Sequence, residues 1–317
     1  MKKVLVTGGT GFVGSRLVRR LAEEVFHVVA PVRSNAGSVP LPADLPLVGD
    51  IDGDTHWKAA LGQVDVVVHA AARAHIMKDE VPDPLAEYRK VNVEGTLNLA
   101  RRAAEAGVRR FVYISSIKVN GEQTSLGAPF SEDDVSSPED PYGVSKMEAE
   151  LGLKRLAEET GLEVVIIRPP LVYGPGVKGN FASMIKLVDK GIPLPLGAVH
   201  NKRSLVALDN LVDLITVCID HPAAANETFL VADGRDVSTT ELLQGIAKAI
   251  GRSSKLIPVP TRMLMLVATS MGKKSVAQRL LGSLQVDISK ARKVLGWAPP
   301  LSVDEGLKRC FINNQDK

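Results

Sequence analysis

A tyrosine and a lysine stand four residues apart in the segment Tyr142-Gly143-Val144-Ser145-Lys146. On a helix, this spacing places both side chains on one face. A free phenol has a pKa near 10, so a tyrosine that exchanges protons near neutral pH needs a neighbour that stabilises its phenolate. The Lys146 ammonium is expected to do this, since lowering the phenol pKa by about three units corresponds to roughly 4 kcal/mol. Together with Ser116, which can hydrogen-bond the same substrate oxygen, these residues are candidates for catalysis of proton transfer.

A glycine-rich turn, Thr7-Gly-Gly-Thr-Gly-Phe-Val-Gly14, follows the first apolar run and opens the first helical pattern. Glycines at positions 8, 11 and 14 let the backbone turn tightly, with its amides facing a diphosphate at a helix N-terminus. A glycine triplet alone also makes ordinary turns, but after the first strand of a βαβ unit it predicts dinucleotide binding. The residues expected to contact the dinucleotide are Gly8, Gly11, Phe12 and Val13.

The residues after the second apolar run bear on which dinucleotide binds. An NAD site usually offers a carboxylate there to hold the adenine-ribose hydroxyls. This chain has Arg33 and Ser34, with no acid before Asp44. An arginine suits a 2′-phosphate, so NADP(H) is favoured; the alternative is a solvated surface arginine in a site that also accepts NAD(H). Asp50 and Ile51 are placed to contact the adenine, although Asp50 alternatively caps a turn.

The first half of the chain alternates short β-branched runs with longer helical patterns. Strands are expected at 3–6, 27–32, 45–48, 64–69, 110–115 and 163–168, and helices at 12–24, 85–106 and 142–160. Because the strands are continuously apolar, helices must cover both faces of their sheet. The pattern predicts an α/β fold with a doubly wound parallel sheet of the NAD(P)-binding Rossmann type.

The regular alternation ends at about residue 168. A helix is expected at 181–189, a strand and helix at 204–220, and two more helices after the capping boxes Ser238-x-x-Glu241 and Ser302-x-x-Glu305. We predict that residues 1–168 form the dinucleotide-binding domain and that 203–222 return to it. Residues 169–202 and 223–317 then form a smaller α/β substrate-binding lobe.

Composition excludes several classes of protein. With 45% hydrophobic and 24% charged residues and a net charge of +3, the 317-residue chain is typical of a globular protein and not of a disordered chain or a dedicated nucleic-acid binder. No apolar run reaches the ~20 residues that cross a bilayer, and the N-terminus resembles no signal or transit peptide. The two cysteines, Cys218 and Cys310, suggest neither a disulfide framework nor a metal site. We expect a cytoplasmic protein with no metal and no nucleic-acid or membrane partner.

Eight motifs recur in an order that resembles one family: TGGTGFVG, VGDI, HAAA, ISSIKVNG, YGVSK, RPPLVYGPG, RSLVALDNLVD and LGWAPPLSVDEGL. The chain resembles an extended short-chain dehydrogenase/reductase of the nucleotide-sugar epimerase/dehydratase family. The resemblance implies that Tyr142 is the proton donor, Lys146 the ribose-binding partner and Ser116 the substrate hydroxyl. It also implies that the cofactor is lined by further residues, namely Asp50, Ile51, Ala70, Ala71, Ala72 and Pro169.

The resemblance implies substrate contacts as well. Asn180 and Arg203 match family residues that meet the diphosphate of a sugar nucleotide, which suits a UDP- or dTDP-sugar. The alternatives are a helix N-cap for Asn180 and a surface ion pair for Arg203. Asn92 matches a family asparagine that either links the strand termini or lies near the nicotinamide end. A homodimer is the family habit.

Two departures from the family pattern narrow the reaction. Dehydratases of the family carry an Asp-Glu pair where this chain has Ile117-Lys118, which argues against dehydration. Leu171 stands where many relatives have an asparagine, so one polar diphosphate contact is missing. Hydride transfer at C4 of a sugar remains.

Our prediction for that reaction is NADPH-dependent reduction of a UDP-4-keto-6-deoxy-N-acetylhexosamine. Arg33 favours it. Three segments, KGNFASMIKLV, PLPLGAVHNKRSLVALDNLVD and SLQVDISKAR, also resemble bacterial 4-ketoreductases that make UDP-N-acetylquinovosamine for O-antigen and other surface polysaccharides. The product is that sugar or its C4 epimer. The first alternative is a UDP-sugar C4 epimerase with tightly bound NAD. The second is a non-catalytic NADP-sensing protein.

Overall fold

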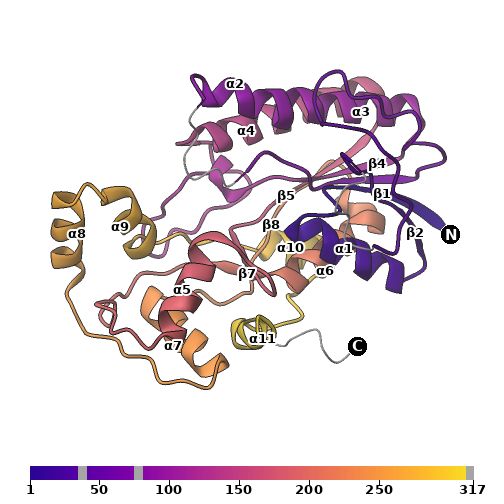
Figure 1. Ribbon diagram of the computed structural model, residues 1–317. Helices are drawn as coiled ribbons and strands as arrows, with labels where there is room; N and C mark the ends of the chain where they lie inside the picture. The colour runs from indigo at the N-terminus through magenta and orange to yellow at the C-terminus, as the bar shows by residue number, and fades with distance from the viewer. Residues whose placement is uncertain (35–40, 75–80, 312–317) are drawn as a thin grey trace.

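Six parallel strands form the central sheet of the protein (Figure 1). The computed structural model describes residues 1–34, 41–74 and 81–311. The strands are β1 (Lys2–Thr7), β2 (Phe26–Val29), β3 (Val66–His69), β4 (Arg110–Ile114), β5 (Glu163–Arg168) and β8 (Thr228–Leu230). Their order is β2-β1-β3-β4-β5-β8. The chain adds β2 on one side of β1 and the later strands on the other side, so the strand order reverses between β1 and β3. Ligands of open parallel sheets bind at such a reversal, outside the carboxyl ends of the strands.

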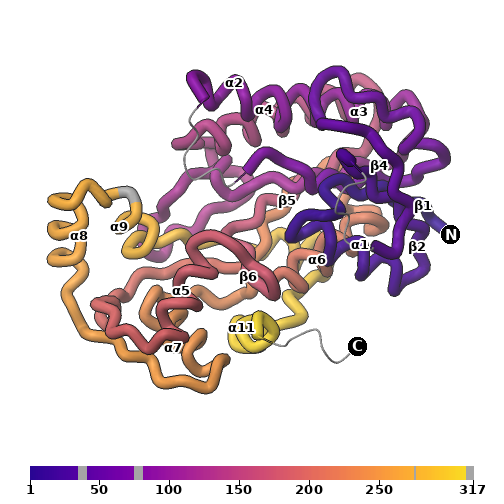
Figure 2. The backbone as a smooth tube through the Cα atoms, in the orientation of Figure 1, coloured from indigo at the N-terminus to yellow at the C-terminus, as the bar shows by residue number. Residues whose placement is uncertain are grey.

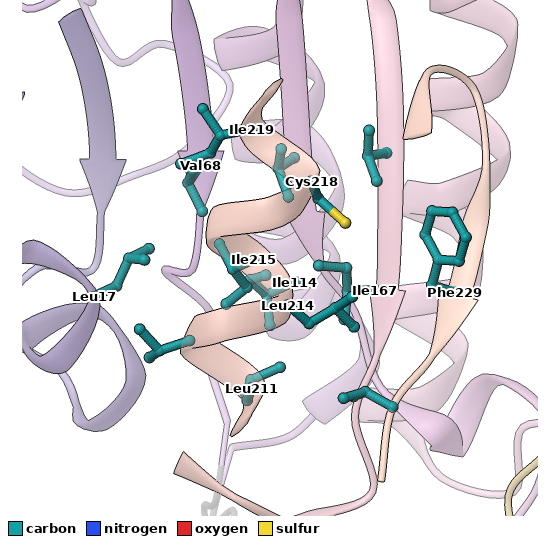
Figure 3. Close-up of a cluster of buried hydrophobic side chains, with 14 of the residues drawn as sticks. Leu17, Val68, Ile114, Ile167, Leu211, Leu214, Ile215, Cys218, Ile219 and Phe229 are labelled. Carbon is teal, nitrogen blue, oxygen red and sulfur yellow. The ribbon is translucent and has the colours of Figure 1, made fainter. Parts of the chain in front are cut away.

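Helices cover both faces of this sheet. Helices α1 (Phe12–Glu23) and α6 (Leu208–Asp220) lie on one face, and α3 (Thr96–Glu105) and α4 (Pro141–Thr160) on the other. Alternate residues of each strand enter the two cores, as Val66 and Val68 do on the α6 side and Val67 on the α4 side. Figure 3 shows the α6 side, where Leu214 and Cys218 face the strands. The predicted doubly wound α/β fold is confirmed.

A smaller group of elements lies below the sheet in Figures 1 and 2. Strands β6 (Leu171–Tyr173) and β7 (Leu205–Ala207) pair in parallel, and helices α5 (Gly179–Asp189), α7 (Thr239–Ala249) and α11 (Val303–Arg309) pack around them. The predicted capping boxes at Ser238 and Ser302 both form. Helices α8 (Thr261–Ser270) and α9 (Lys274–Leu281) project at the left edge.

Two predicted elements differ in the structure. The strand expected at 45–48 is reduced to isolated bridges, in which Asp44 pairs with Val29 and Leu47 with Val32. The single helix expected at 85–106 is divided into α2 (Pro84–Arg89), a π-helix at Lys90–Gly95, and α3. A π-helical turn holds one more residue than an α-helical turn, and the spacing of apolar residues is too coarse to show this difference. The sequence pattern therefore predicted one continuous α-helix.

The two lobes do not separate at the residue boundaries that we predicted from the sequence. Strand β8 falls in the segment assigned to the smaller lobe, but it pairs with β5 at the edge of the central sheet. Helix α10 (Ser289–Leu295) likewise adds Ala291 and Leu295 to the core beneath α6. Within the described ranges, no helix combines the length and the apolar content needed to span a membrane. Those ranges also contain no cluster of three His, Cys, Asp or Glu side chains suited to a metal ion.

Candidate active site

The glycine-rich turn has the shape of a diphosphate cradle. Gly8 has φ +69°, and the amide of Gly11 donates to its carbonyl oxygen at 2.8 Å. A Cβ on Gly8 would lie 2.8 Å from the backbone nitrogen of Ala71, and one on Gly14 would lie 2.1 Å from the carbonyl oxygen of Gly8. Gly11 caps α1 without a side-chain hydrogen bond, and the first turn holds no acid. The helix therefore offers free amides to an anion, which fits a dinucleotide diphosphate.

We expect Gly14→Ala to destabilise the protein by about 3 kcal/mol and to weaken nicotinamide-cofactor binding at least tenfold. The added methyl would clash with backbone atoms of Gly8, which cannot move aside as the end of a flexible side chain could. Urea unfolding and cofactor titration measure the two effects. Gly62→Ala is the matched control, because nothing lies within 4 Å of its added Cβ. Equal behaviour of the two variants would remove the steric role of Gly14.

His69 joins three elements behind the cradle. The Thr7 hydroxyl accepts a hydrogen bond from the amide of Ala71 at 3.2 Å, which leaves its proton for Nδ1 of His69 at 2.7 Å. Nε2 of His69 then lies 3.0 Å from Oγ1 of Thr96 in α3, so the hydrogen-bond network assigns the proton to Nε2. Complete burial, followed by the charge of Lys146, lowers the pKa of His69 to about 3. The neutral imidazole thus fixes the ends of β1 and β3 against α3.

This burial predicts a loss of stability in acid. Between pH 6.5 and the lowered pKa, the unfolded chain binds a proton that native His69 does not. The free energy of unfolding therefore falls as the pH falls through this window, by up to about 1.4 kcal/mol per pH unit. Urea titrations from pH 7 to pH 4 should show a steeper decline for the wild type than for His69→Gln. Parallel curves would mean that His69 is accessible to protons in the native state.

The residues predicted to contact the adenine and its ribose lie after β2. Arg33 and Asp50 are 79% and 84% exposed, and their charged groups are 3.7 Å apart. The carbonyl oxygen of Asp50 accepts from the Thr55 hydroxyl at 2.8 Å, so its backbone supports a turn. Ile51 packs against Gly95 of the π-helix, where an added Cβ would lie 2.8 Å from its Cγ2. An ion pair between two exposed side chains contributes little stability, so Asp50 does not hold Arg33 in place. The Arg33 guanidinium is therefore accessible to a ligand.

The three candidate catalytic residues come together at the carboxyl end of β4. Ser116 follows the strand in an extended conformation, and Tyr142 is the second residue of α4, which Asp140 caps through the amide of Gly143 at 2.7 Å. Ser116 hydrogen-bonds Tyr142. Lys146 is 1% exposed; its Nζ donates to the carbonyl oxygen of Ile114 at 2.8 Å and lies 5.9 Å from the Tyr142 ring centroid.

The electrostatics of the pair differ from our expectation in one respect. Burial raises the pKa of Tyr142, the charge of Asp140 adds to the rise, and only the Ser116 hydrogen bond opposes it. Burial also lowers the pKa of Lys146 to about 7, with Glu150 acting in the opposite direction. We expected Lys146 to depress the phenol pKa. The largest influence on the Tyr142 pKa is instead the loss of hydration on burial, and Lys146 is not among the groups that shift it.

A buried ion pair behind the trio was not foreseen. Glu150 lies one helical turn beyond Lys146. Its carboxylate accepts hydrogen bonds from two nitrogens of Arg168, from Nε at 3.0 Å and from Nη2 at 2.5 Å. The hydroxyl of Ser115 donates to the same carboxylate at 2.5 Å, and Arg168 donates to Oδ1 of Asn120 at 3.0 Å. This network holds α4 to the ends of β4 and β5. The i, i+4, i+8 spacing of Tyr142, Lys146 and Glu150 was the available signal.

Asn92 makes a second link that the sequence left open. Its amide group bonds the backbone of Arg73 in both directions, at 2.9 and 3.1 Å, and donates to Ser145 Oγ at 3.0 Å. Ser145 Oγ donates in turn to the carbonyl oxygen of Tyr142 at 2.8 Å. Asn92 therefore joins the chain after β3 to the first turn of α4, and Tyr88 packs edge-on against Tyr142 at 6.0 Å between ring centroids.

Residues expected to line the cofactor are distributed unevenly. Ala70 and Ala71 lie against Gly8, whereas Ala72 is exposed. Pro169 is buried after β5, and its carbonyl oxygen accepts from the amide of Ile117 at 3.0 Å. Lys118, which replaces an acid of the family dehydratases, pairs with Asp140 and with Glu122. That cation therefore braces the start of α4.

The two expected diphosphate anchors lie in different settings. Asn180 is an exposed residue in the first turn of α5, whose N-cap is Lys178, so the N-cap alternative for Asn180 is wrong. Arg203 lies between Val237 and Leu284, and its Nη1 donates to the carbonyl oxygen of Gly282 at 3.1 Å. Burial lowers the pKa of Arg203. It forms no ion pair with any carboxylate in the described residues, so the surface-pair alternative is not what the structure shows.

A cradle for a dinucleotide and a tyrosine–lysine–serine trio at the ends of a doubly wound sheet define a nicotinamide-dependent enzyme. The model of the NAD dependent epimerase/dehydratase family matches residues 4–232, and the chain belongs to this family. It is 51% identical over 309 residues to UDP-glucose 4-epimerase of Vibrio cholerae, covering 97% of this chain and 94% of that protein.

Solved structures share the fold across the chain. UDP-glucose 4-epimerase of Thermotoga maritima, solved with UDP-glucose, superposes with a TM-score of 0.77 at 26% identity, covering 97% of each chain. UDP-glucuronic acid 4-epimerase of Bacillus cereus, solved with NAD, gives a TM-score of 0.77 at 24% identity, covering 97% of this chain and 96% of that one. The resemblance inferred from the motifs is confirmed.

Proposed function

We propose that the protein interconverts C4 epimers of a UDP-sugar, with NAD as its cofactor. The observation that carries this proposal is the assembled trio of Ser116, Tyr142 and Lys146 in a chain that is 51% identical to a UDP-glucose 4-epimerase over nearly its whole length. The proposal reverses the order of our two sequence-based alternatives. High identity over both the cradle and the smaller lobe supports the epimerase more directly than Arg33 supports a reductase.

The residues divide the work at one carbon. A nicotinamide cofactor held at the glycine cradle would supply the reversible hydride chemistry that inversion at C4 needs. Tyr142 takes the proton of the C4 hydroxyl as that carbon is oxidised and gives it back when the carbon is reduced, so protons and electrons balance over the cycle. Ser116 holds the C4 oxygen by its hydroxyl. Lys146, at the back of the Tyr142 ring, favours the phenolate when it carries its proton.

The substrate diphosphate is assigned to Arg203, with Asn180 as a second contact. The partly buried guanidinium of Arg203 donates to a carbonyl oxygen and, among the described residues, to no carboxylate, so it retains donors for an anion. Leu171, 39% exposed at the start of β6, offers no polar contact there. Homodimer formation and a role in surface-polysaccharide synthesis remain proposals from the family resemblance, and a cytoplasmic location remains an expectation from the sequence.

The 4-ketoreductase is the second candidate, because Arg33 offers an exposed cation where a 2′-phosphate would lie. The test is to incubate the purified protein and NAD with UDP-glucose or UDP-N-acetylglucosamine and to identify sugars by NMR. We expect the C4 epimer to form with no net change in reduced-nicotinamide absorbance. If no epimer forms while UDP-4-keto-6-deoxy-N-acetylglucosamine consumes NADPH stoichiometrically, the reductase replaces the epimerase. If neither reaction occurs, both are overturned, and a cofactor-sensing role is left.

Arg33 provides an independent test of cofactor choice. If its guanidinium holds a 2′-phosphate, Arg33→Ala should weaken NADPH binding by about tenfold and leave NADH binding within twofold. Titration of both cofactors by fluorescence measures this ratio. We expect instead a slight and equal effect on the binding of both cofactors, because the Arg33 side chain is solvated and the reaction proposed here uses NAD. A selective loss of NADPH would instead support the reductase.

A further inference from the structure

Helix α8 presents apolar side chains on two faces. Leu264, Met265 and Ala268 pack inward against the cluster formed by Val199, Ala277 and Leu281. The opposite face carries Met263, Leu266, Val267 and Met271, which are 56%, 71%, 57% and 60% exposed. Their spacing of i, i+3, i+4 and i+8 is that of a continuous helical stripe. A stripe of this kind on a surface helix marks a contact with something outside the fold.

The segment of the chain that carries this stripe has charges of one sign. Residues 242–286 contain seven Lys and Arg and no Asp or Glu, whereas the whole chain is nearly balanced, with 39 basic and 36 acidic residues. Arg262, Lys273, Lys274 and Arg279 are exposed on or beside α8 and α9. In the part of the chain that the structure describes, none of the four pairs with a carboxylate. The surface therefore combines exposed apolar side chains with unneutralised cations.

We propose that this α8–α9 surface docks on an anionic phospholipid bilayer, with the stripe at the level of the headgroups and the cations on lipid phosphates. Apolar residues on one face with Lys and Arg beside them are the pattern of helices that lie in a membrane interface. A second copy of the chain fits less well, because a symmetric contact through this surface would bring the same four cations face to face. The proposal concerns peripheral contact, and our expectation of no membrane partner rested on the lack of a spanning segment.

The surface is coupled by the chain to the substrate side of the molecule. Helix α9 ends at Leu281, and the next residue, Gly282, accepts the hydrogen bond of Arg203. Asn201 donates to the carbonyl oxygens of Leu280 and Gly282 at 3.2 and 2.8 Å. Docking would therefore hold the proposed diphosphate arginine close to the bilayer. This inference does not depend on whether the reaction is an epimerisation.

The test is sedimentation of the full chain with vesicles of phosphatidylglycerol and phosphatidylcholine, against vesicles of phosphatidylcholine alone. We expect binding to the anionic vesicles only, weakened by added salt. Leu266→Glu and the pair Lys273→Glu/Lys274→Glu should each weaken it by about tenfold or more. The matched controls are Val25→Glu, at an 80% exposed valine between α1 and β2, and Lys154→Glu/Arg155→Glu in α4, which makes the same change in net charge as the lysine pair. In Figure 1, α1 and β2 lie at the opposite side of the molecule from α8.

Four outcomes would overturn the proposal. Wild-type protein that binds both vesicle types equally, or neither, would remove the anionic bilayer as the partner. Control variants that lose as much binding as the α8–α9 variants would reduce the effect to overall charge. Sedimentation velocity without lipid covers the remaining case, since an oligomer that Leu266→Glu dissociates would assign the stripe to a second copy. All of these substitutions are at exposed residues, and circular dichroism verifies that each variant is folded.

Discussion

Tyr142→Phe should lower turnover by about 10³-fold while leaving nicotinamide-cofactor binding within about twofold. The substitution removes one oxygen and keeps the ring that packs against Tyr88 and faces Lys146. Without the hydroxyl, no group in the trio can take the C4 proton and return it, since Ser116 has a far less acidic hydroxyl. Steady-state kinetics with the sugar that the wild type converts, together with cofactor titration, measure the two effects separately.

Ser116→Ala is the informative companion to this variant. It removes the one contact that lowers the pKa of Tyr142, so the acidic limb of the pH–rate profile should move to higher pH while some turnover persists. A Tyr142→Phe enzyme within tenfold of wild-type activity would reject the tyrosine as proton carrier. A Ser116→Ala profile that does not move would limit the serine to substrate binding.

Glu150→Gln should destabilise the protein by about 3–5 kcal/mol, because it leaves the Arg168 guanidinium buried without a counter-charge. Both side chains of this pair are less than 5% exposed. The chain offers a close control two residues earlier on the same helix. Glu148 also accepts two nitrogens of an arginine, Arg89, at 2.8 and 2.5 Å, but that pair is exposed and screened by water.

Urea unfolding of the two variants therefore compares one chemical change in two environments. We expect a large loss for Glu150→Gln and a small one for Glu148→Gln. Removing the Glu150 charge should also lower the pKa of Lys146 further, so the variant should lose turnover preferentially at neutral pH and above, where its Lys146 is unprotonated. Similar losses of stability for both variants would show that Arg168 is solvated or finds another partner.

Much of the site could be predicted because its signals are local. The glycines at 8, 11 and 14 follow a strand and open a helix, and Tyr142 and Lys146 are one helical turn apart. Each of these patterns indicates the backbone conformation at its own position, a tight turn for the glycines and a helix for the tyrosine and lysine. The fold class was predictable for the same reason, since continuously apolar strands require cover on both faces.

The rest depends on contacts that no local pattern records. Glu150 and Arg168 look like ordinary charged residues of a helix and a strand until the sheet brings them together. His69 reads as the end of an apolar run, and its neutral state follows only from burial between Thr7 and Thr96. The strand expected at 45–48 had suitable residues, but the chain there forms only isolated bridges with the last residue of β2 and with Val32.

The π-helix at Lys90–Gly95 fixes the length of the chain at this point. Relative to an α-helix it accommodates an additional residue in its turn, and Asn92 is thereby placed on the backbone of Arg73 and on Ser145. A one-residue deletion there would restore ordinary helical winding and rotate Asn92 by about 100°. The first turn of α4 would lose its tether although no residue of the trio had changed. Spacing between motifs is thus itself part of the site, and aligned homologues should vary more readily in residue type than in length across 90–95.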